Sequence, residues 1–192
     1  LYDRVAPVIT KETGLPVLGF LPELPQCTLP SRHLGLVTAD EIADLSQKLD
    51  ELGEAAAQSI DLQGLLRLAQ IAPPLEFTPR AVMPLPHVRI AVARDDAFCF
   101  YYDETLALFK ALGAKPVFFS PLKDDGLPPG AQALYLGGGY PELYAERLSQ
   151  NSTMLQSVRS AIAGCMPCLA ECGGFLYLHE QLQGCTGAFY PM

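Results

Sequence analysis

Apolar residues in the first seventy positions recur every three or four residues, which is the period of one face of an α-helix. The pattern predicts a helix over 1–13 and, in the continuous apolar run that follows, a buried strand over 15–21. Thr38 or Asp40 can cap a second helix, and a third begins at Asp61. The apolar positions of these two helices, which we expect to pack into a core, are Ile42, Leu45, Leu49, Leu52, Leu62, Leu65, Leu66 and Ala69.

From residue 88 onward, short apolar runs alternate with segments of helical period. The runs predict strands over 88–93, 116–120, 133–136 and 166–170. The periodic segments predict helices between Asp103 and Gly113, over 153–163 and after Cys172. This alternation is typical of an α/β fold with a doubly wound, mostly parallel sheet, in which the active site lies at the carboxyl ends of the strands.

A proline-rich segment separates the two halves. Five prolines between 73 and 86 remove backbone donors and disfavour both helix and sheet. We therefore expect two domains, 1–72 and 88–192, joined by a linker over 73–87. Both ends interrupt predicted structure, so we expect the chain to be a piece of a longer protein.

Composition narrows the classes of partner. The chain has 192 residues, 49% of them hydrophobic, which is ample for a core, and a formal net charge of −8 without any basic run. This balance argues against nucleic acid and anionic membranes as partners. We find no apolar stretch long enough to span a bilayer and no signal peptide, and expect a cytoplasmic location with six reduced cysteines.

The residues around Cys172 have the pattern of a nucleophile elbow, a sharp turn between a strand and a helix. Ala170 and Gly174, two positions before and after, are small, as the turn requires. A helix N-terminus favours a thiolate, and the N–H group of Gly173 is placed to bind an oxyanion. The same pattern also suits a buried structural cysteine before a Gly-Gly turn, so the spacing alone leaves both interpretations open.

Three glycines, at 137–139, follow the predicted strand 133–136 and so fall at the same edge of the sheet as Cys172. Bare backbone there lets a substrate approach and lets N–H groups face a developing negative charge. The alternative is a tight turn that uses glycine for positive φ. Beside an elbow cysteine, the loop would form half of a site for thiol acyl transfer.

Four motifs in this chain, in the same order, resemble those of the cobyrinic acid a,c-diamide synthase family, whose glutaminase part is of the class I glutamine amidotransferase type. They are LGGGYPE at 136–142, AECGG at 170–174, ARDDAFCFYY at 93–102, and PVLG at 16–19 with LPSRHLGL at 29–36. The resemblance covers nearly the whole chain. It implies a flavodoxin-like glutaminase half, preceded by the C-terminal part of a P-loop-type synthetase domain.

By this resemblance, the whole enzyme amidates the a and c carboxylates of cobyrinic or hydrogenobyrinic acid in cobalamin biosynthesis, with glutamine as nitrogen donor and Mg-ATP as activator. Cys172 would attack the glutamine amide to give a glutamyl thioester and ammonia. Gly173, with Gly138 or Gly139, would hold the tetrahedral oxyanion. The partners are then small molecules, namely glutamine, ATP and the macrocycle. A homodimer would cover the sheet edges that a truncated domain leaves unpaired.

The chain also departs from the family pattern. The family's catalytic histidine lies well downstream of the cysteine, beyond Met192, and we expect His179 on the elbow helix, about two turns away, in a surface or capping role. Leu176 stands where many class I glutaminases have glutamine. No G-x-x-x-x-G-K-[ST] phosphate loop is present, so we expect the ATP and Mg²⁺ sites in a part that precedes this chain. We therefore expect the isolated chain to hydrolyse neither glutamine nor ATP.

Arg32 and His33 lie in a loop that the resemblance places near the synthetase site, where they would touch nucleotide or a macrocycle carboxylate; simple solvation is the alternative.

The spacing of Cys165, Cys168 and Cys172 could hold an iron–sulfur cluster, but two of them belong to a strand and its end, and we assign no metal.

Four aromatic residues near the start of the second half either pack or line a passage between two active sites: Phe98, Phe100, Tyr101 and Tyr102.

Two other functions stay open. One is the same chemistry on another tetrapyrrole, such as nickel sirohydrochlorin. The other is a non-catalytic protein that retains the glutaminase fold.

Overall fold

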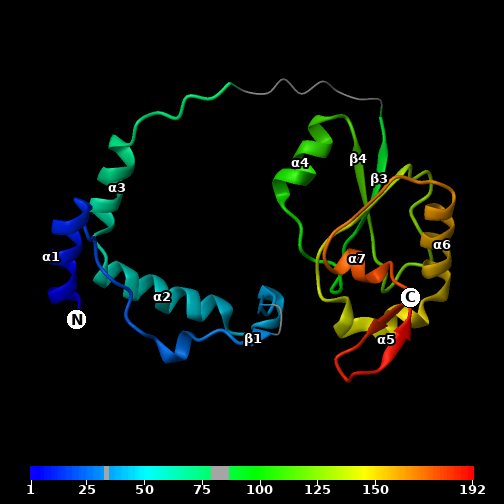
Figure 1. The fold of residues 1–192 in the computed structure, drawn as a ribbon, viewed down its shortest axis with the longest axis horizontal. Helices are drawn as coiled ribbons and strands as arrows, with labels where there is room; N and C mark the ends of the chain where they lie inside the picture. Colours follow the sequence, from blue (N-terminus) through cyan, green and yellow to red (C-terminus); the bar gives the residue numbers. More distant parts are fainter. Residues whose placement is uncertain (33–34, 79–86) are drawn as a thin grey trace. The chain divides into compact units, whose positions relative to one another are not determined.

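The computed structural model describes residues 1–32, 35–78 and 87–192. The chain divides into two compact units, Leu1–Thr78 and Pro79–Met192, which are described separately below (Figure 1). The boundary between them falls within the proline-rich segment, of which residues 79–86 lie outside the described residues.

The first unit consists of helices and a short antiparallel hairpin. Its elements are α1 (Tyr2–Thr13), η1 (Pro25–Cys27), β1 (Ser31–Arg32), β2 (Gly35–Leu36), η2 (Ala39–Glu41), α2 (Leu45–Ser59) and α3 (Leu62–Ile71). Helix α1 ends at Gly14, whose φ of 70° is the left-handed conformation that favours glycine. The Asp61 carboxylate caps α3 by accepting from the N–H of Gly64, as predicted. Thr38 caps η2, and α2 begins only at Leu45.

Two expectations for this unit are wrong. Segment 15–21 is not a strand: the described chain gives it no neighbouring strand, only an isolated bridge from Gly19 to Ile60. The helical stripes also form no buried core, since Leu65 and Leu66 are 52% and 53% exposed. Among residues of this unit whose side chains are described, only Cys27 and Gly64 are buried.

The second unit is an α/β domain built on a parallel sheet, as the sequence predicts. Its four strands are β3 (Arg89–Ala93), β4 (Lys115–Phe119), β5 (Ala133–Leu136) and β6 (Cys168–Ala170), in the order β4-β3-β5-β6. The other elements are α4 (Asp103–Ala111), η3 (Pro141–Tyr144), α5 (Ala145–Gln150), α6 (Ser152–Ala163), α7 (Gly173–Tyr177) and the antiparallel pair β7 (Gln181–Gln183) and β8 (Phe189–Pro191). The sequence pattern did not predict η3, α5, β7 or β8.

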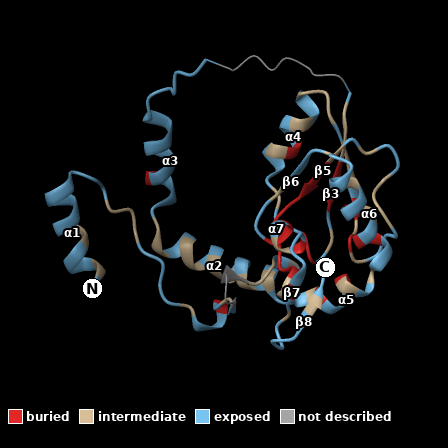
Figure 2. Cartoon of the chain, turned by 45° about the vertical axis from the view of Figure 1, so that its right-hand side comes forward, coloured by how far each residue is buried: buried red, intermediate tan, exposed pale blue. Residues whose placement is uncertain are grey.

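Helices cover both faces of this sheet, because successive side chains of a strand point to opposite faces. On one face, Ala91, Ala93, Leu134 and Leu136 pack against Met154, Leu155 and Val158 of α6. On the other, Val92 and Tyr135 pack against Leu106 of α4. Figure 1 shows α4 and α6 on either side of the strands, and Figure 2 shows the buried residues concentrated along β3 and β5.

The loops that follow the strands are tied together at the carboxyl edge of the sheet. The Asp95 carboxylate accepts from the backbone N–H groups of Ala97 and Phe98, from the Ser120 hydroxyl and from the N–H of Leu122. This side chain therefore fixes the loops after β3 and β4. None of the described helices combines the length and apolar composition needed to cross a lipid bilayer.

Candidate active site at the carboxyl edge of the sheet

Cys172 stands between β6 and α7 in a strained backbone conformation, with φ 50° and ψ −115°. For a residue with a Cβ such a conformation costs on the order of 1–3 kcal/mol, and residues of this kind concentrate at functional sites. Cys165, with φ 62°, is the other described non-glycine residue with positive φ. The Cys172 side chain is exposed, so it is not the buried structural cysteine that its spacing also allowed.

Gly174 joins the start of α7 directly to the end of β5. Its N–H group donates to the carbonyl oxygen of Gly137 at 2.9 Å, and a Cβ atom here would lie 2.2 Å from the carbonyl oxygen of Leu136. The backbones approach too closely for any side chain, which explains the small residue that the elbow pattern requires at this position.

The glycine loop lies against the elbow. A Cβ on Gly138 would be 3.7 Å from the Cβ of Cys172, and a Cβ on Gly173 would be 2.8 Å from the carbonyl oxygen of Gly139. The N–H of Phe100 donates to the carbonyl oxygen of Gly138 at 3.0 Å and holds the loop from its other side. The structure thus brings together Cys172, Gly138, Gly139 and Gly173.

Close packing, rather than turn conformation, accounts for the glycines of this loop. None of the residues 137–139 has positive φ. A Cβ on Gly139 would lie 2.1 Å from the carbonyl oxygen of Ala97, and one on Gly137 would lie 2.4 Å from the ring of Tyr101. The turn interpretation of these glycines is therefore wrong.

An exposed thiol beside bare backbone amides is an arrangement suited to acyl transfer. The N–H of Gly173, at the first position of α7, has no acceptor within its own helix. A thiol can attack a carbonyl carbon, while backbone N–H groups nearby stabilise the negative charge that develops on its oxygen.

Two tyrosines hold the backbone around this corner. The Tyr101 hydroxyl donates to the carbonyl oxygen of Ala93 and accepts from the N–H of Gly137 at 2.9 Å. The Tyr135 hydroxyl donates to Oε2 of Glu171, the residue before Cys172, at 2.7 Å. Burial raises the pKa of Tyr101 to about 12. The pKa of Tyr135 is also raised, first by burial and then by the hydrogen bond to Glu171 and its charge.

The sequence predicted neither tyrosine as part of the site. Tyr101 belongs to the aromatic cluster that the sequence assigns either to packing or to the lining of a passage between two active sites. That cluster is the only feature of the sequence that draws attention to Tyr101. Tyr135 lies inside a strand, where an aromatic residue is unremarkable by pattern alone.

Both synthetase-site candidates belong to the first unit, which is described separately from the unit that carries Cys172. Arg32 is in β1 of the first unit and its side chain is not described; His33 lies outside the described residues.

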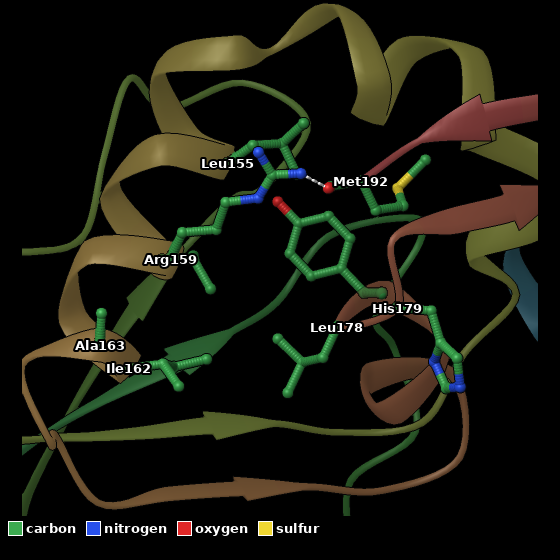
Figure 3. A pocket seen from close by; sticks show the side chains of 9 residues that line it. Leu155, Arg159, Ile162, Ala163, Leu178, His179 and Met192 are labelled. Atoms are coloured by element: carbon green, nitrogen blue, oxygen red, sulfur yellow. Dashed lines mark hydrogen bonds between the residues drawn. The ribbon is translucent and has the colours of Figure 1, made fainter.

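His179 was expected on the elbow helix, and this is wrong because α7 ends at Tyr177. Its Nδ1 atom lies 3.0 Å from the carbonyl oxygen of Phe175, and its ring meets the Phe175 ring edge-on. His179 also lines a pocket of about 350 Å³ with residues of α6. Figure 3 shows His179 and Arg159 on opposite sides of this pocket, with the Arg159 guanidinium donating to the Met192 carbonyl.

The cysteines do not form a cluster. Cys165 and Cys168 precede or begin β6, whereas Cys172 follows its other end. Burial raises the pKa of the Cys168 thiol, which disfavours a thiolate ligand there. In the part of the chain that the structure describes, no three His, Cys, Asp or Glu side chains are grouped to hold a metal ion.

Comparison with known proteins gives relatives along the whole chain. The cobyrinate a,c-diamide synthase of Priestia megaterium is 42% identical over 193 residues, covering 100% of this chain and 42% of the relative. Those of Caldanaerobacter subterraneus subsp. tengcongensis and a Synechocystis species are 39% and 40% identical, covering 100% and 93% of this chain and 42% and 38% of the relatives. The chain thus spans about two fifths of their length. No solved structure shows a significant match.

A family match coincides with the α/β unit that carries the site. Residues 89–188, slightly more than half of the chain, match the CobB/CobQ-like glutamine amidotransferase domain. The matched range starts at the first residue of β3 and includes the glycine loop and the elbow. The chain therefore belongs to the family of CobB/CobQ-like glutamine amidotransferase domains.

Proposed function

We propose that this chain supplies the glutamine-cleaving part of a cobyrinate a,c-diamide synthase. The observation that carries the proposal is the exposed Cys172, held at φ 50° against a loop of three glycines. The thiolate sulfur attacks the side-chain amide carbon of glutamine, and the C–N bond then breaks as ammonia leaves. Water cleaves the resulting glutamyl thioester to glutamate and restores the thiol.

Backbone amides stabilise the tetrahedral intermediate. The N–H of Gly173 and that of Gly138 or Gly139 are the donors in this proposal, because Gly173 follows Cys172, Gly138 lies against the Cys172 Cβ and Gly139 lies against Gly173. Loss of one such donor costs about 2.7–4 kcal/mol of transition-state stabilisation in other acyl-transfer enzymes.

The amide nitrogen must gain a proton to leave as ammonia, and neither histidine that the structure describes is our candidate for donating it. His87 lies before the amino end of β3, with its Nδ1 atom 3.3 Å from the carbonyl oxygen of Gly113. His179 lies against Phe175, and we assign neither histidine as the base. The family's histidine would come from a region that this chain does not include.

The remaining steps belong to the whole protein. Ammonia would react with an a or c carboxylate of cobyrinic or hydrogenobyrinic acid that Mg-ATP has activated, and the first unit would be the C-terminal part of the synthetase domain. The names of the relatives support cobyrinate over another tetrapyrrole such as nickel sirohydrochlorin. Product analysis of the intact protein with each macrocycle separates these substrates.

Labelling tests the nucleophile. A glutamine-shaped diazo ketone should modify Cys172 of the intact protein and abolish glutaminase turnover, whereas Cys172→Ser should not be labelled. Cys185→Ser, which removes another exposed cysteine, is the control and should label normally. Modification of a different cysteine, or full turnover by Cys172→Ser, would contradict the assignment.

The isolated chain provides a separate test of the missing histidine. We expect it to show no glutamine or ATP hydrolysis. Glutaminase turnover that disappears in Cys172→Ser would mean that the general base lies within these 192 residues.

A further inference from the structure

The two loops that form the candidate site are each fastened to the sheet by a tyrosine hydroxyl. We propose that Tyr101 and Tyr135 are positioning residues, which keep the glycine loop and the elbow at the separation that amide cleavage needs. The inference rests on the proposed glutaminase function of the same site.

Tyr101 acts where the pairing of β3 with β5 stops. The last paired residues of these strands are Val92 and Tyr135. Beyond them, the Tyr101 hydroxyl replaces the next hydrogen bond between the two strands. It donates to the carbonyl oxygen of Ala93 and accepts from the N–H of Gly137. Both backbone groups belong to buried residues, so they need this partner.

The Tyr101 ring also lies on the loop itself, since a Cβ on Gly137 would be 2.4 Å from it. The first peptide of the glycine loop is thereby fixed by a hydrogen bond and by ring packing. Gly138 and Gly139, which carry the candidate oxyanion donors, follow directly.

Tyr135 holds the other loop. Its side chain is 3% exposed, and its hydroxyl donates to the Glu171 carboxylate. The N–H of Glu171 donates to the carbonyl oxygen of Leu136 at 2.9 Å. The residue immediately before Cys172 is therefore attached to β5 through both its backbone and its side chain, which helps to hold the strained φ at Cys172.

The two tyrosines contact each other. Their rings meet edge-on, with centroids 5.3 Å apart and an interplanar angle of 89°. Because the rings are in contact, movement of one loop is transmitted to the other, and we expect the effects of removing the two hydroxyls to be non-additive.

The test compares two reagents on the intact protein. A glutamine-shaped diazo ketone requires the aligned site, whereas iodoacetamide requires only an accessible thiol. We expect Tyr101→Phe and Tyr135→Phe to slow labelling of Cys172 by the diazo ketone by about 10- to 100-fold, since small misplacements of reacting groups have effects of this size. The rate with iodoacetamide should stay unchanged. Tyr102→Phe, which alters the 78% exposed neighbour, should change neither rate.

A second pair of variants tests the same hydrogen bond if Tyr135→Phe fails to fold. Glu171→Gln keeps an oxygen that accepts from the Tyr135 hydroxyl and should label at nearly the wild-type rate. Glu171→Ala should be slowed as Tyr135→Phe is. We expect the same difference between Glu171→Gln and Glu171→Ala in glutaminase turnover. In Glu171→Ala the fall in kcat should be larger than any change in KM, because alignment matters most in the transition state.

The outcomes are distinguishable. If the wild-type protein shows no preference for the diazo ketone over iodoacetamide, the proposed glutaminase function fails. If that preference exists and the variants retain it, or if both reagents slow equally, Tyr101 and Tyr135 only support the fold and the inference is overturned.

Discussion

At the scale of single residues, the site depends on backbone segments that touch without side chains between them. Gly174 shows this best, because a Cβ there would lie 2.2 Å from the Leu136 carbonyl oxygen and 2.6 Å from its carbonyl carbon. Neither backbone atom can move aside without shifting β5. The elbow and the strand beside it are therefore specified together.

We predict that Gly174→Ala lowers the free energy of unfolding by about 3 kcal/mol, the upper part of the usual range for overpacking. Denaturant unfolding measures the change. The control is Gly53→Ala in α2, where a Cβ meets nothing within 4 Å and alanine should stabilise the helix by about 0.5–1 kcal/mol. A Gly174→Ala protein as stable as the wild type would show that this contact is looser than described.

The sequence predicted that Cys172 and its glycines would meet at one edge of the sheet, because the elbow is a local pattern of neighbouring small residues, and the structure brings them together. Their roles in amide cleavage stay a prediction. The sequence was insufficient for the tyrosines. The Tyr101 hydroxyl bonds Gly137, 36 residues away, and Tyr135 bonds Glu171, also 36 residues away. Such partners depend on strand order, which no local spacing encodes.

At the scale of elements, Asn151 links α6 to the long connection between β4 and β5. Its Oδ1 caps the helix by accepting from the N–H of Met154 at 3.3 Å. Its amide nitrogen donates to the carbonyl oxygens of Pro121 and Asp124 at 2.8 and 2.9 Å. One side chain thus serves both as a helix cap and as the anchor of a loop.

We predict that Asn151→Ala lowers the free energy of unfolding by about 2 kcal/mol, as expected when a cap and neighbouring hydrogen bonds are lost together. Asn151→Ser should lose about half as much, because serine keeps the cap and removes the two amide donations. Thermal unfolding compares them. If the two variants lose equal stability, the helix cap contributes nothing to stability. If Asn151→Ser is as stable as the wild type, the two amide donations to the loop contribute nothing.

Periodicity predicted the strands and longer helices of the α/β unit because each has a neighbour that buries its apolar face. The same reasoning failed for 15–21, where an apolar run has no adjacent strand in the described chain. Helix α7 is shorter than expected because the chain turns after Tyr177 and enters β7 at Gln181. Tertiary neighbours, rather than propensity, decided these cases.

At the scale of the whole chain, the two units differ in how much they bury. Core residues such as Val92, Leu136 and Met154 are 0% exposed, whereas the helices of the first unit leave Leu62, Leu65 and Ile71 exposed by 42–76%. Stability arises mainly from burial of apolar surface.

We therefore predict that amide hydrogen exchange is slow in β3, β5 and α6 and fast in α1 and α3. Protection follows local stability, and few buried contacts support the helices of the first unit. Mass spectrometry of the isolated chain measures it peptide by peptide. Equal protection of α3 and α6 would contradict this reading, since it would require a core in the first unit that the described side chains lack.

Two buried phenols, of Tyr135 and Tyr177, and the partly buried phenol of Tyr101 make the second unit sensitive to alkaline pH. The pKa of Tyr101 is raised from 10.0 to about 12, and burial also raises the pKa values of Tyr135 and Tyr177. A raised pKa means that the unfolded chain loses the proton first. Stability from these groups is therefore complete below pH 10 and decreases as pH rises from 10 toward 12.

The urea midpoint of the wild-type protein should fall as pH rises from 10 toward 12. The midpoint of Tyr101→Phe should fall less over the same range. Tyr102→Phe, which alters an exposed phenol, is the matched control and should follow the wild type. A midpoint that stays constant through this pH range would mean that these hydroxyls titrate alike in the folded and unfolded chains.

The backbone of residue 172 also bears on how such a site disappears during evolution. At φ 50° glycine, which has no Cβ, is less strained than cysteine. A lineage that no longer used the thiol would therefore gain stability by replacing Cys172 with glycine. Under the proposed function, the need for a thiol nucleophile opposes this substitution. Homologous sequences with glycine at this place would then record branches in which amide cleavage has been abandoned while the scaffold survives.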